Sequence, residues 1–455
     1  MKAITTGNVS TDRTDDQDFG VRLWVGRATA VPIGFLITLY LLVTSRWGSY
    51  LTIPGAPFYI GDMFVALAVA QVIVAVRASP ALLVRVMRAP VVLLLVLSLL
   101  AYASLRLVFG FQISATTLRD FAPYGYAVIA LPAFLLPLRE GGRWRRAIYA
   151  CFVAHLLWVV LLPRLPGFPW SLPVLGSDAI LLGARPDFDS TVLGLGAAFA
   201  VRDLFLHPGS RRPAQALGLL ALIALSLFGV VNLGTRAGLL AGLFAIAAIL
   251  VTSTMARSNS AKSGRRIRVL RVRLLRFFAM LTIFAIGIGV VALTPSGSRL
   301  VAGLSDASSS AYGTVAVRKN VWDRVGDYVF RDPKRTAIGV GFGRNFIAES
   351  GSSLALEGTE YQNVRSPHNY VIGTLARLGV AGGLLVSIII GLGWWLALSR
   401  LRQLASPVTV LASLLALALP VIALLGVVLE SPFGAIPYFW AIGHLAAAGA
   451  RQSAL

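Results

Sequence analysis

The sequence predicts an all-α, polytopic membrane protein with about 12 transmembrane helices, and two observations lead to that prediction. Of the 455 residues, 57% are hydrophobic and only 13% are charged, whereas soluble domains carry about 25% charged residues. Apolar runs of about 20 residues recur along the whole chain, and each is long enough to cross a bilayer as a helix. We therefore expect membrane-spanning helices and not a soluble enzyme.

Hydropathy divides the chain into four parts. We expect a disordered cytoplasmic polar tail (1–28), transmembrane spans one to nine (29–294), an extracytoplasmic loop (295–378), and spans ten to twelve with a short cytoplasmic tail (379–455). The long polar insertion occupies 295–367 and is partly helical. The spans are expected near 29–46, 57–76, 90–109, 122–138, 147–163, 188–206, 214–232, 236–255, 275–294, 379–399, 407–429 and 433–450.

Arginines in the short loops predict the orientation of these spans. Every second loop is rich in arginine and the alternate loops are sparse, which is the bias of loops that stay in the cytoplasm. Both termini are then cytoplasmic, while the 295–367 loop, Arg236 and His368 lie on the outer face. The arginine-rich loops contain Arg77, Arg85, Arg88, Arg139, Arg143, Arg145, Arg146, Arg211, Arg212, Arg257, Arg265, Arg266, Arg268, Arg271, Arg273, Arg400, Arg402 and Arg451.

Charge and cysteine content argue against two other kinds of site. The net charge of +22 would suggest nucleic acid as a partner, but the topology-setting loops account for it, so we expect none. Cys151 is the only cysteine, which excludes disulfides and cysteine-based metal sites within the chain.

His368 is the histidine placed to do chemistry. Ser366 can cap a helix and Pro367 suits the first helical position, so we expect His368 in the first turn of a helix. An imidazole there can accept a proton from a hydroxyl near neutral pH. The alternative is that His368 and Asn369 only cap and anchor an interfacial helix. Three further histidines are interpreted as packing or interfacial residues: His155, His207 and His444.

The stretch "NLGTRAGLLAGL" predicts a phosphate site at a helix start. Thr235 can cap the eighth span, Arg236 lies in its first turn, and the small Ala237 and Gly238 would let a bulky anion approach. Unpaired backbone donors together with a guanidinium bind phosphate well. The alternative is an ordinary interfacial arginine, but arginines on the outer face run against the orientation bias.

The long loop holds further candidate residues. An amphipathic helix is expected around Arg318, because Val317, Val321, Val325 and Tyr328 recur on one face. The glycines that follow lack the spacing of a dinucleotide motif, and we expect a tight turn near a substrate, contributed by Gly341, Gly343 and Arg344.

The segment "ARPDFDS" contains Arg185, Asp187 and Asp189 in another outer loop. Two carboxylates so spaced can hold a divalent metal beside a diphosphate. Capping of the sixth span is the simpler interpretation, so we expect no metal and assign Arg185 and Asp187 to substrate binding.

These residues resemble a known pattern. The signature of the O-antigen ligase and polysaccharide polymerase family is His followed by Asn, Ser or Gln, nine residues, and Gly-x-x-Gly, Thr or Tyr. The sequence is similar at His368-Asn369, the nine residues Tyr370–Leu378, and Gly379 with Gly382. The position of the large loop between spans nine and ten also resembles that family.

The family's second signature, Arg-x-x-x-Leu at the outer end of a span, is matched by Arg236 and Leu240. A further arginine of the outer loop, ahead of a glycine-rich turn, is matched best by Arg318, with Arg324 or Arg344 as alternatives.

The resemblance implies a glycosyltransferase of the cytoplasmic membrane that makes surface polysaccharide. Its donor would be a glycan on polyprenyl (undecaprenyl) diphosphate, and its acceptor a hydroxyl of a saccharide or lipid-linked glycan at the outer face. His368 would be the base, and Arg236 and Arg318 would bind the diphosphate without a metal or other cofactor. Membrane lipids would surround the spans.

Two alternatives remain open. Repeat-unit polymerisation would use the same residues with a carrier-linked acceptor. A solute transporter usually places ionisable residues near mid-membrane, whereas the candidate residues here gather on the outer face.

Overall fold

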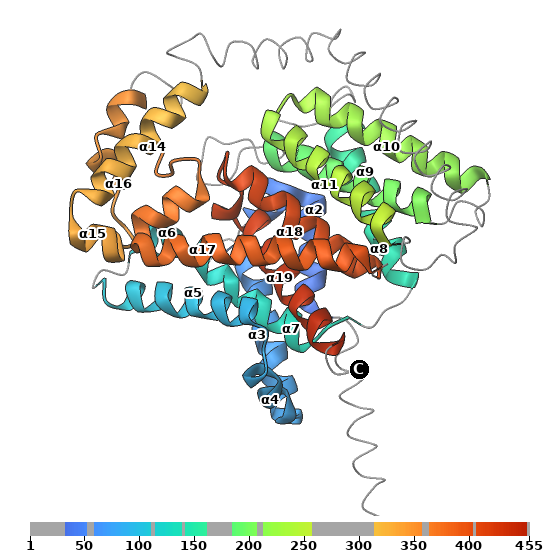
Figure 1. The fold of residues 1–455 in the computed structure, drawn as a ribbon, viewed down its shortest axis with the longest axis horizontal. Coiled ribbons are helices and arrows are strands. Elements are labelled where there is room, and N and C mark those ends of the chain that lie inside the picture. The colour runs from blue at the N-terminus through green and yellow to red at the C-terminus, as the bar shows by residue number, and fades with distance from the viewer. Residues whose placement is uncertain are drawn as a thin grey trace, which may run out of the picture.

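The structure is a computed structural model, and its regular elements are helices, which confirms the all-α class (Figure 1). It describes residues 32–51, 59–110, 114–138, 142–161, 184–206, 213–256, 314–356, 364–403 and 406–452. The α-helices are α2 (Ile33–Ser49), α3 (Ile60–Ala78), α4 (Ala81–Met87), α5 (Val91–Val108), α6 (Ala115–Gly125), α7 (Ala130–Leu135), α8 (Gly142–Leu156), α9 (Pro186–Leu206), α10 (Pro213–Leu233), α11 (Arg236–Ala256), α14 (Thr314–Phe330), α15 (Pro333–Ile338), α16 (Phe346–Glu349), α17 (Tyr370–Arg402), α18 (Pro407–Ala423) and α19 (Pro432–Gln452). The short elements are η1 (Tyr126–Ile129), η2 (Leu157–Leu161), η6 (Ser352–Leu356) and η7 (Val428–Glu430).

The long helices have the length and composition of membrane spans. Among the described residues, 4 helices are long and apolar enough to cross a bilayer, namely α3, α5, α10 and α17. Each predicted span in the described ranges overlaps helical structure, with α6, η1 and α7 together covering the fourth. The protein is therefore a multi-pass membrane protein. The expected tail 1–28 and the ninth span (275–294) lie outside the described residues, so the total of twelve spans stays a prediction.

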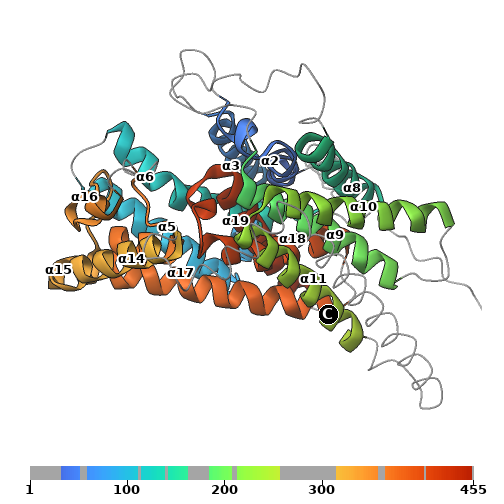
Figure 2. The same ribbon diagram turned by 90° about the horizontal axis from the view of Figure 1, so that it is seen from above.

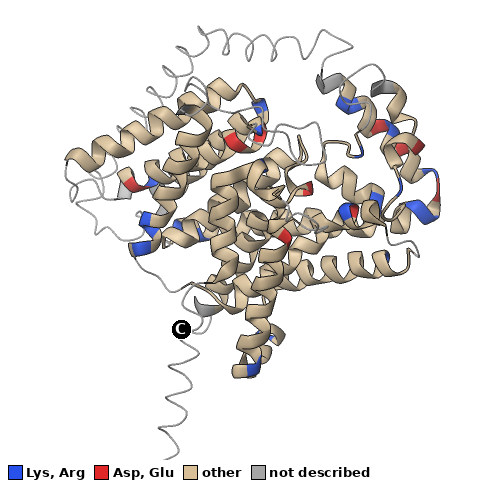
Figure 3. Ribbon diagram, turned by 180° about the vertical axis from the view of Figure 1, so that it is seen from behind, with Lys and Arg blue, Asp and Glu red and all other residues tan. Residues whose placement is uncertain are grey.

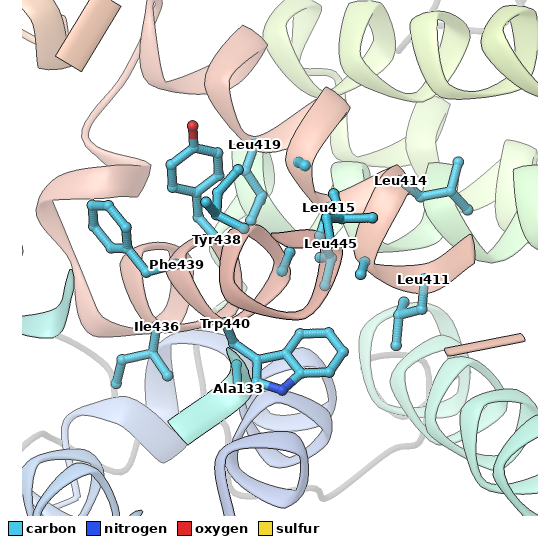
Figure 4. Close-up of a cluster of buried hydrophobic side chains, with 14 of the residues drawn as sticks. Ala133, Leu411, Leu414, Leu415, Leu419, Ile436, Tyr438, Phe439, Trp440 and Leu445 are labelled. Atoms are coloured by element: carbon cyan, nitrogen blue, oxygen red, sulfur yellow. The ribbon is translucent and has the colours of Figure 1, made fainter. Parts of the chain in front are cut away.

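Helices α18 and α19 form the centre of the bundle. α18 carries no charged residue and is buried nearly all round, as expected for a helix that is apolar on every face. Leu411, Leu414 and Leu415 of α18 and Trp440 of α19 are at most 1% exposed, and Trp440 packs towards Ala133 of α7 (Figure 4). Helices α2, α9, α11 and α17 contact this central pair, so it fixes where their ends lie.

A polar segment, α14 to η6, lies beside α17 at one side of the bundle (Figure 2). Charged side chains gather there and at helix ends, whereas the central helices are almost free of them (Figure 3). The expected amphipathic helix is confirmed, since Val321, Val325 and Val329 of α14 are buried against Phe346, Ile347 and Ala376.

Gly379 divides α17 into two arms, with φ 68° and ψ −168°, a conformation that glycine adopts far more readily than other residues. At this break the carbonyls of Ala376 and Arg377 accept hydrogen bonds from the N–H groups of Val340 (2.8 Å) and Gly341 (2.9 Å). The polar segment is thereby hydrogen-bonded to the break. The helix begins at Tyr370, ahead of the expected tenth span at 379–399, and residue 379 is a kink within it.

We expect Gly379→Ala to destabilise the protein. A Cβ at this position would lie 2.4 Å from the carbonyl oxygen of Ala337, and the left-handed backbone alone costs a side-chain-bearing residue about 1–2 kcal/mol. Thermal unfolding in detergent should show a lower midpoint, and hydrogen exchange should rise over residues 333–345. Gly391→Ala, in the second arm of α17 with nothing within 4 Å of its Cβ position, is the matched control and should be neutral or slightly stabilising. Equal effects of the two changes would contradict this account.

Candidate functional site

The starts of α9 and α11 lie against each other because small residues line their contact. A Cβ at Gly194 would lie 2.5 Å from the Cα of Gly242, so the two backbones touch. The hydroxyl of Thr235 donates to the carbonyl of Pro186 at 3.0 Å and lies 3.0 Å from the Ser190 hydroxyl. We expected the Thr235 hydroxyl to cap α11. It instead joins α11 to α9.

Arg236 is the first residue of α11 and is partly buried. Its position at the start of α11 places its charge beside the unpaired N–H groups of that turn. Among the described residues no carboxylate forms an ion pair with it. Gly238, expected to make room for an anion, instead packs against α9, where its Cβ would lie 2.3 Å from that of Ser190.

Arg185 and Asp187 form an ion pair at the start of α9. The Arg185 Nε lies 3.0 Å from the Asp187 Oδ1, and both side chains are partly exposed. Asp189 is fully buried, and its carboxylate accepts a hydrogen bond from the Arg185 N–H. Arg185 thus serves both carboxylates, Asp187 through its guanidinium and Asp189 through its backbone N–H, which fits a helix start better than a shared cation. The described residues hold no group of three or more His, Cys, Asp or Glu placed for a metal.

His368 lies in the loop that precedes α17. Its φ is 55°, and its N–H donates to the Ser366 hydroxyl at 3.1 Å. The side chain of Asn369 caps α17, accepting from the N–H groups of Val371 and Ile372 at 3.0 and 3.1 Å. The expectation that Ser366 caps the helix, with His368 in its first turn, is therefore wrong. Both Ser and Asn are good caps, and here Ser366 instead closes a turn around His368.

Helix α14 brings Arg318 to the His368 loop. The Nη1 of Arg318 donates to the carbonyl of Leu425 at 2.8 Å. One turn along the helix, the indole Nε1 of Trp322 donates to the carbonyl of Pro367 at 2.7 Å. These two hydrogen bonds hold the guanidinium next to the loop that carries the imidazole.

The alternative arginines of the polar segment are held elsewhere. Arg324 is exposed and donates to the carbonyl of Gly351 at 3.2 Å. Arg344 forms an ion pair with Glu349 at 2.7 Å. Arg318 is therefore the arginine of this segment that the structure brings to His368.

Gly341 and Gly343 hold the polar segment to the bundle. The Gly343 N–H donates to the Asp120 carboxylate at 3.1 Å, which also pairs with Arg365 (3.0 Å) and Arg377 (2.6 Å). Together with the bond from Gly341 to α17, this gives the glycines a clear structural role. Substrate binding by Gly341, Gly343 and Arg344 stays a prediction.

Burial and nearby positive charges lower the pKa of the His368 imidazole to about 4. Burial is the largest cause, because it disfavours the charged imidazolium. The positive charges of Arg318 and Arg185 act in the same direction, and Asp187 opposes them. His368 is therefore neutral at pH 7, able to accept a proton, and within the field of two guanidiniums. Arg185, Asp187 and Arg318 are thus close enough to His368 to shift its pKa.

Sequence analysis missed the segment 424–431, which connects α18 to α19 and enters this site. Leu425 accepts the hydrogen bond from Arg318, and the Glu430 carboxylate accepts one from the Ser366 hydroxyl at 2.7 Å. An acidic residue between two strongly apolar spans was the available signal. Its partner is 64 residues away, so the sequence pattern did not reveal the contact.

Comparison with protein families identifies part of the chain. Residues 221–387 match a family model described as O-antigen ligase. The matched segment includes Arg236, Arg318 and His368, whereas Arg185 precedes it and Glu430 follows it. No curated protein is similar enough to the chain to be matched to it.

We expect His368 to titrate well below the ordinary histidine range, with a midpoint near pH 4. Arg318→Gln should move that midpoint upward, because a nearby positive charge that disfavours the imidazolium is removed. NMR of protein labelled at its histidines, with His368 assigned from a His368→Gln sample, measures both values.

Arg324→Gln is the control for that titration, because it removes an exposed guanidinium from the same helix. It should leave the midpoint of His368 unchanged. If the midpoint shifts with Arg324 and not with Arg318, the assignment of Arg318 to this site is wrong.

Proposed function

Because the chain carries an O-antigen ligase domain over residues 221–387, we propose that it moves a glycan from a polyprenyl diphosphate carrier to an acceptor hydroxyl. The transfer takes place at the outer face of the cytoplasmic membrane, where the arginine bias puts the His368 loop, and it serves the synthesis of a surface polysaccharide. One observation supports this above the others: Trp322 of α14 donates to the carbonyl of Pro367, beside His368, and so holds Arg318 of the same helix next to that loop.

The arginines bind the diphosphate of the donor. Arg236 and the first turn of α11 supply a guanidinium and unpaired N–H groups, and Arg185 and Arg318 add two further positive charges near His368. Guanidiniums match phosphate oxygens with paired hydrogen bonds. Negative charge grows on the diphosphate as the glycosidic bond breaks, so fixed positive groups stabilise the transition state more than the ground state.

His368 accepts the proton of the acceptor hydroxyl. The hydroxyl oxygen attacks the anomeric carbon, the bond from that carbon to the diphosphate oxygen breaks, and polyprenyl diphosphate leaves with the bonding electrons. Burial, and after it the two guanidiniums, hold the pKa of His368 low. A bound diphosphate offsets their charge, so the imidazole becomes a stronger base when the donor is in place. No nucleotide sugar or metal enters this scheme.

A repeat-unit polymerase is the second candidate, because the same residues serve an acceptor that is itself carried on a polyprenyl diphosphate. A transporter is disfavoured, since the charged residues that surround His368 lie in loops and at helix starts, whereas transport sites lie near the middle of the membrane.

We expect His368→Ala and Arg236→Ala each to abolish transfer while membrane insertion stays normal. Loss of a general base costs about 10²–10⁴-fold in rate, and loss of one charge-stabilising group costs about 10²–10³-fold. The assay is purified protein with a labelled polyprenyl-diphosphate glycan and a set of acceptors. Arg331→Ala, which removes a guanidinium that is 79% exposed, is the control and should transfer normally. Near-normal product from either site variant removes that residue from the mechanism.

The same assay separates the two candidate functions. We expect a single transfer to a dissimilar saccharide or lipid-linked glycan acceptor. A ladder of products made from the carrier-linked donor alone would identify a polymerase instead. Uptake of a small solute by proteoliposomes that is unaffected by His368→Ala would contradict both.

A further inference from the structure

The segment 424–431 contacts three separate parts of the site. Leu425 accepts the hydrogen bond from Arg318, and a Cβ at Gly426 would lie 3.1 Å from the Oδ2 of Asp187. Glu430 accepts the hydrogen bond from Ser366.

The segment 424–431 is held in place by its buried side chains and by the start of α19. The side chains of Val428 and Leu429 are fully buried, and the N–H of Glu430 donates to the carbonyl of Val427 at 2.9 Å. α19 begins directly afterwards, and a Cβ at Gly434 would lie 2.2 Å from the Val428 carbonyl oxygen. Glu430 is therefore fixed by the two central helices of the bundle.

A chain of two hydrogen bonds runs from Glu430 to the backbone of His368. The Ser366 hydroxyl donates its single proton to the Oε1 of Glu430 at 2.7 Å. That leaves a lone pair of the hydroxyl oxygen for the N–H of His368, which donates to it at 3.1 Å. The carboxylate therefore fixes which way the serine hydroxyl points.

The backbone of His368 needs such support. Its φ of 55° is a left-handed conformation that L-residues rarely adopt, and it sets the direction in which the imidazole leaves the chain. Such conformations persist where surrounding contacts hold them in place. The Ser366 hydroxyl supplies one of these contacts, and Glu430 orients that hydroxyl.

We propose that Glu430 is a positioning residue that, through Ser366, holds His368 in the left-handed conformation and so aims its imidazole at the arginines and the acceptor. This inference rests on the proposed function, because it assigns how the base of that reaction is held. Glu430 lies outside the segment that matches the family model, and the assignment comes from its hydrogen bonds alone.

The test compares Glu430→Ala, Glu430→Gln, Ser366→Ala and the double variant Ser366→Ala with Glu430→Ala in the transfer assay. We expect Glu430→Ala to lower kcat about 10–100-fold, since small displacements of a catalytic group have effects of that size. The KM for the donor should stay within about twofold, because the arginines that bind it are untouched. Glu430→Gln keeps an oxygen that accepts from Ser366 and should recover most of kcat. The double variant should be no slower than the slower single variant, because both act through one chain of bonds.

The pH profile provides a readout that a purely structural contact would not change in the same way. If His368 leaves its place near Arg318 and Arg185, its pKa rises towards the ordinary value, so the acidic limb of the kcat profile moves to higher pH in Glu430→Ala. Asp187 is the facing acid that opposes the arginines, and it is unchanged. Burial raises the pKa of the Glu430 carboxyl, and Glu430 is not among the charges that shift the pKa of His368. Removal of the carboxyl without displacement of His368 should therefore leave the limb in place, and a shift to higher pH identifies displacement.

Asp327→Ala is the matched control, since it removes a carboxylate of the polar segment that is 71% exposed, and it should change neither kcat nor the acidic limb. Thermal unfolding of every variant identifies a change that only weakens the fold, and the glutamine variant tests the proposal if the alanine variant does not fold. Normal kcat in Glu430→Ala or Ser366→Ala, with His368→Ala inactive, overturns this inference and leaves the proposed function standing. An active His368→Ala overturns the proposed role of the base itself.

Discussion

The break in α17 at Gly379 is the constraint on which the arrangement of the site depends. It presents the carbonyls of Ala376 and Arg377 to the N–H groups of Val340 and Gly341, and so ties a polar segment to an apolar helix through main-chain bonds. Arg377 reinforces the junction by pairing with Asp120. Once α15 is docked there, α14 lies along the first arm of α17, and Arg318 reaches the His368 loop. Gly379 of the ligase-like signature therefore has a structural role, while the proposed chemistry rests on its histidine.

In the proposed function, the pKa of the His368 imidazole depends on whether the donor diphosphate is bound. Burial first, and then the positive charges of Arg318 and Arg185, disfavour the imidazolium of His368. In the proposed reaction, a bound diphosphate would offset those charges and raise the proton affinity of the ring. Asp187, which pairs with Arg185 at 3.0 Å, limits the positive excess before the donor binds. Basicity thus grows when a substrate is present to use it.

The sequence predicted the helices well, because apolar runs of spanning length are strong local signals. The amphipathic pattern of α14 was equally clear, and the family resemblance then favoured Arg318 within it. The kink at Gly379 could not be predicted, since apolar residues continue through it and the cause lies in a loop about forty positions away. His368 was predicted inside the first turn of the helix but precedes it, because Ser366 and Asn369 are comparable caps and Asn369 is the one used. Glu430 was missed because its partner is 64 residues distant.

The late position of the segment 424–431 has a consequence for how the protein is made. Synthesis delivers the imidazole of His368 and the guanidiniums of Arg236 and Arg318 before α18 and α19 have left the ribosome. A nascent chain therefore holds every reacting group of the site while the central helical pair that aligns them is still missing. On the proposed function, insertion of α18 and α19 would complete the alignment, and a shorter nascent chain would not yet transfer the glycan.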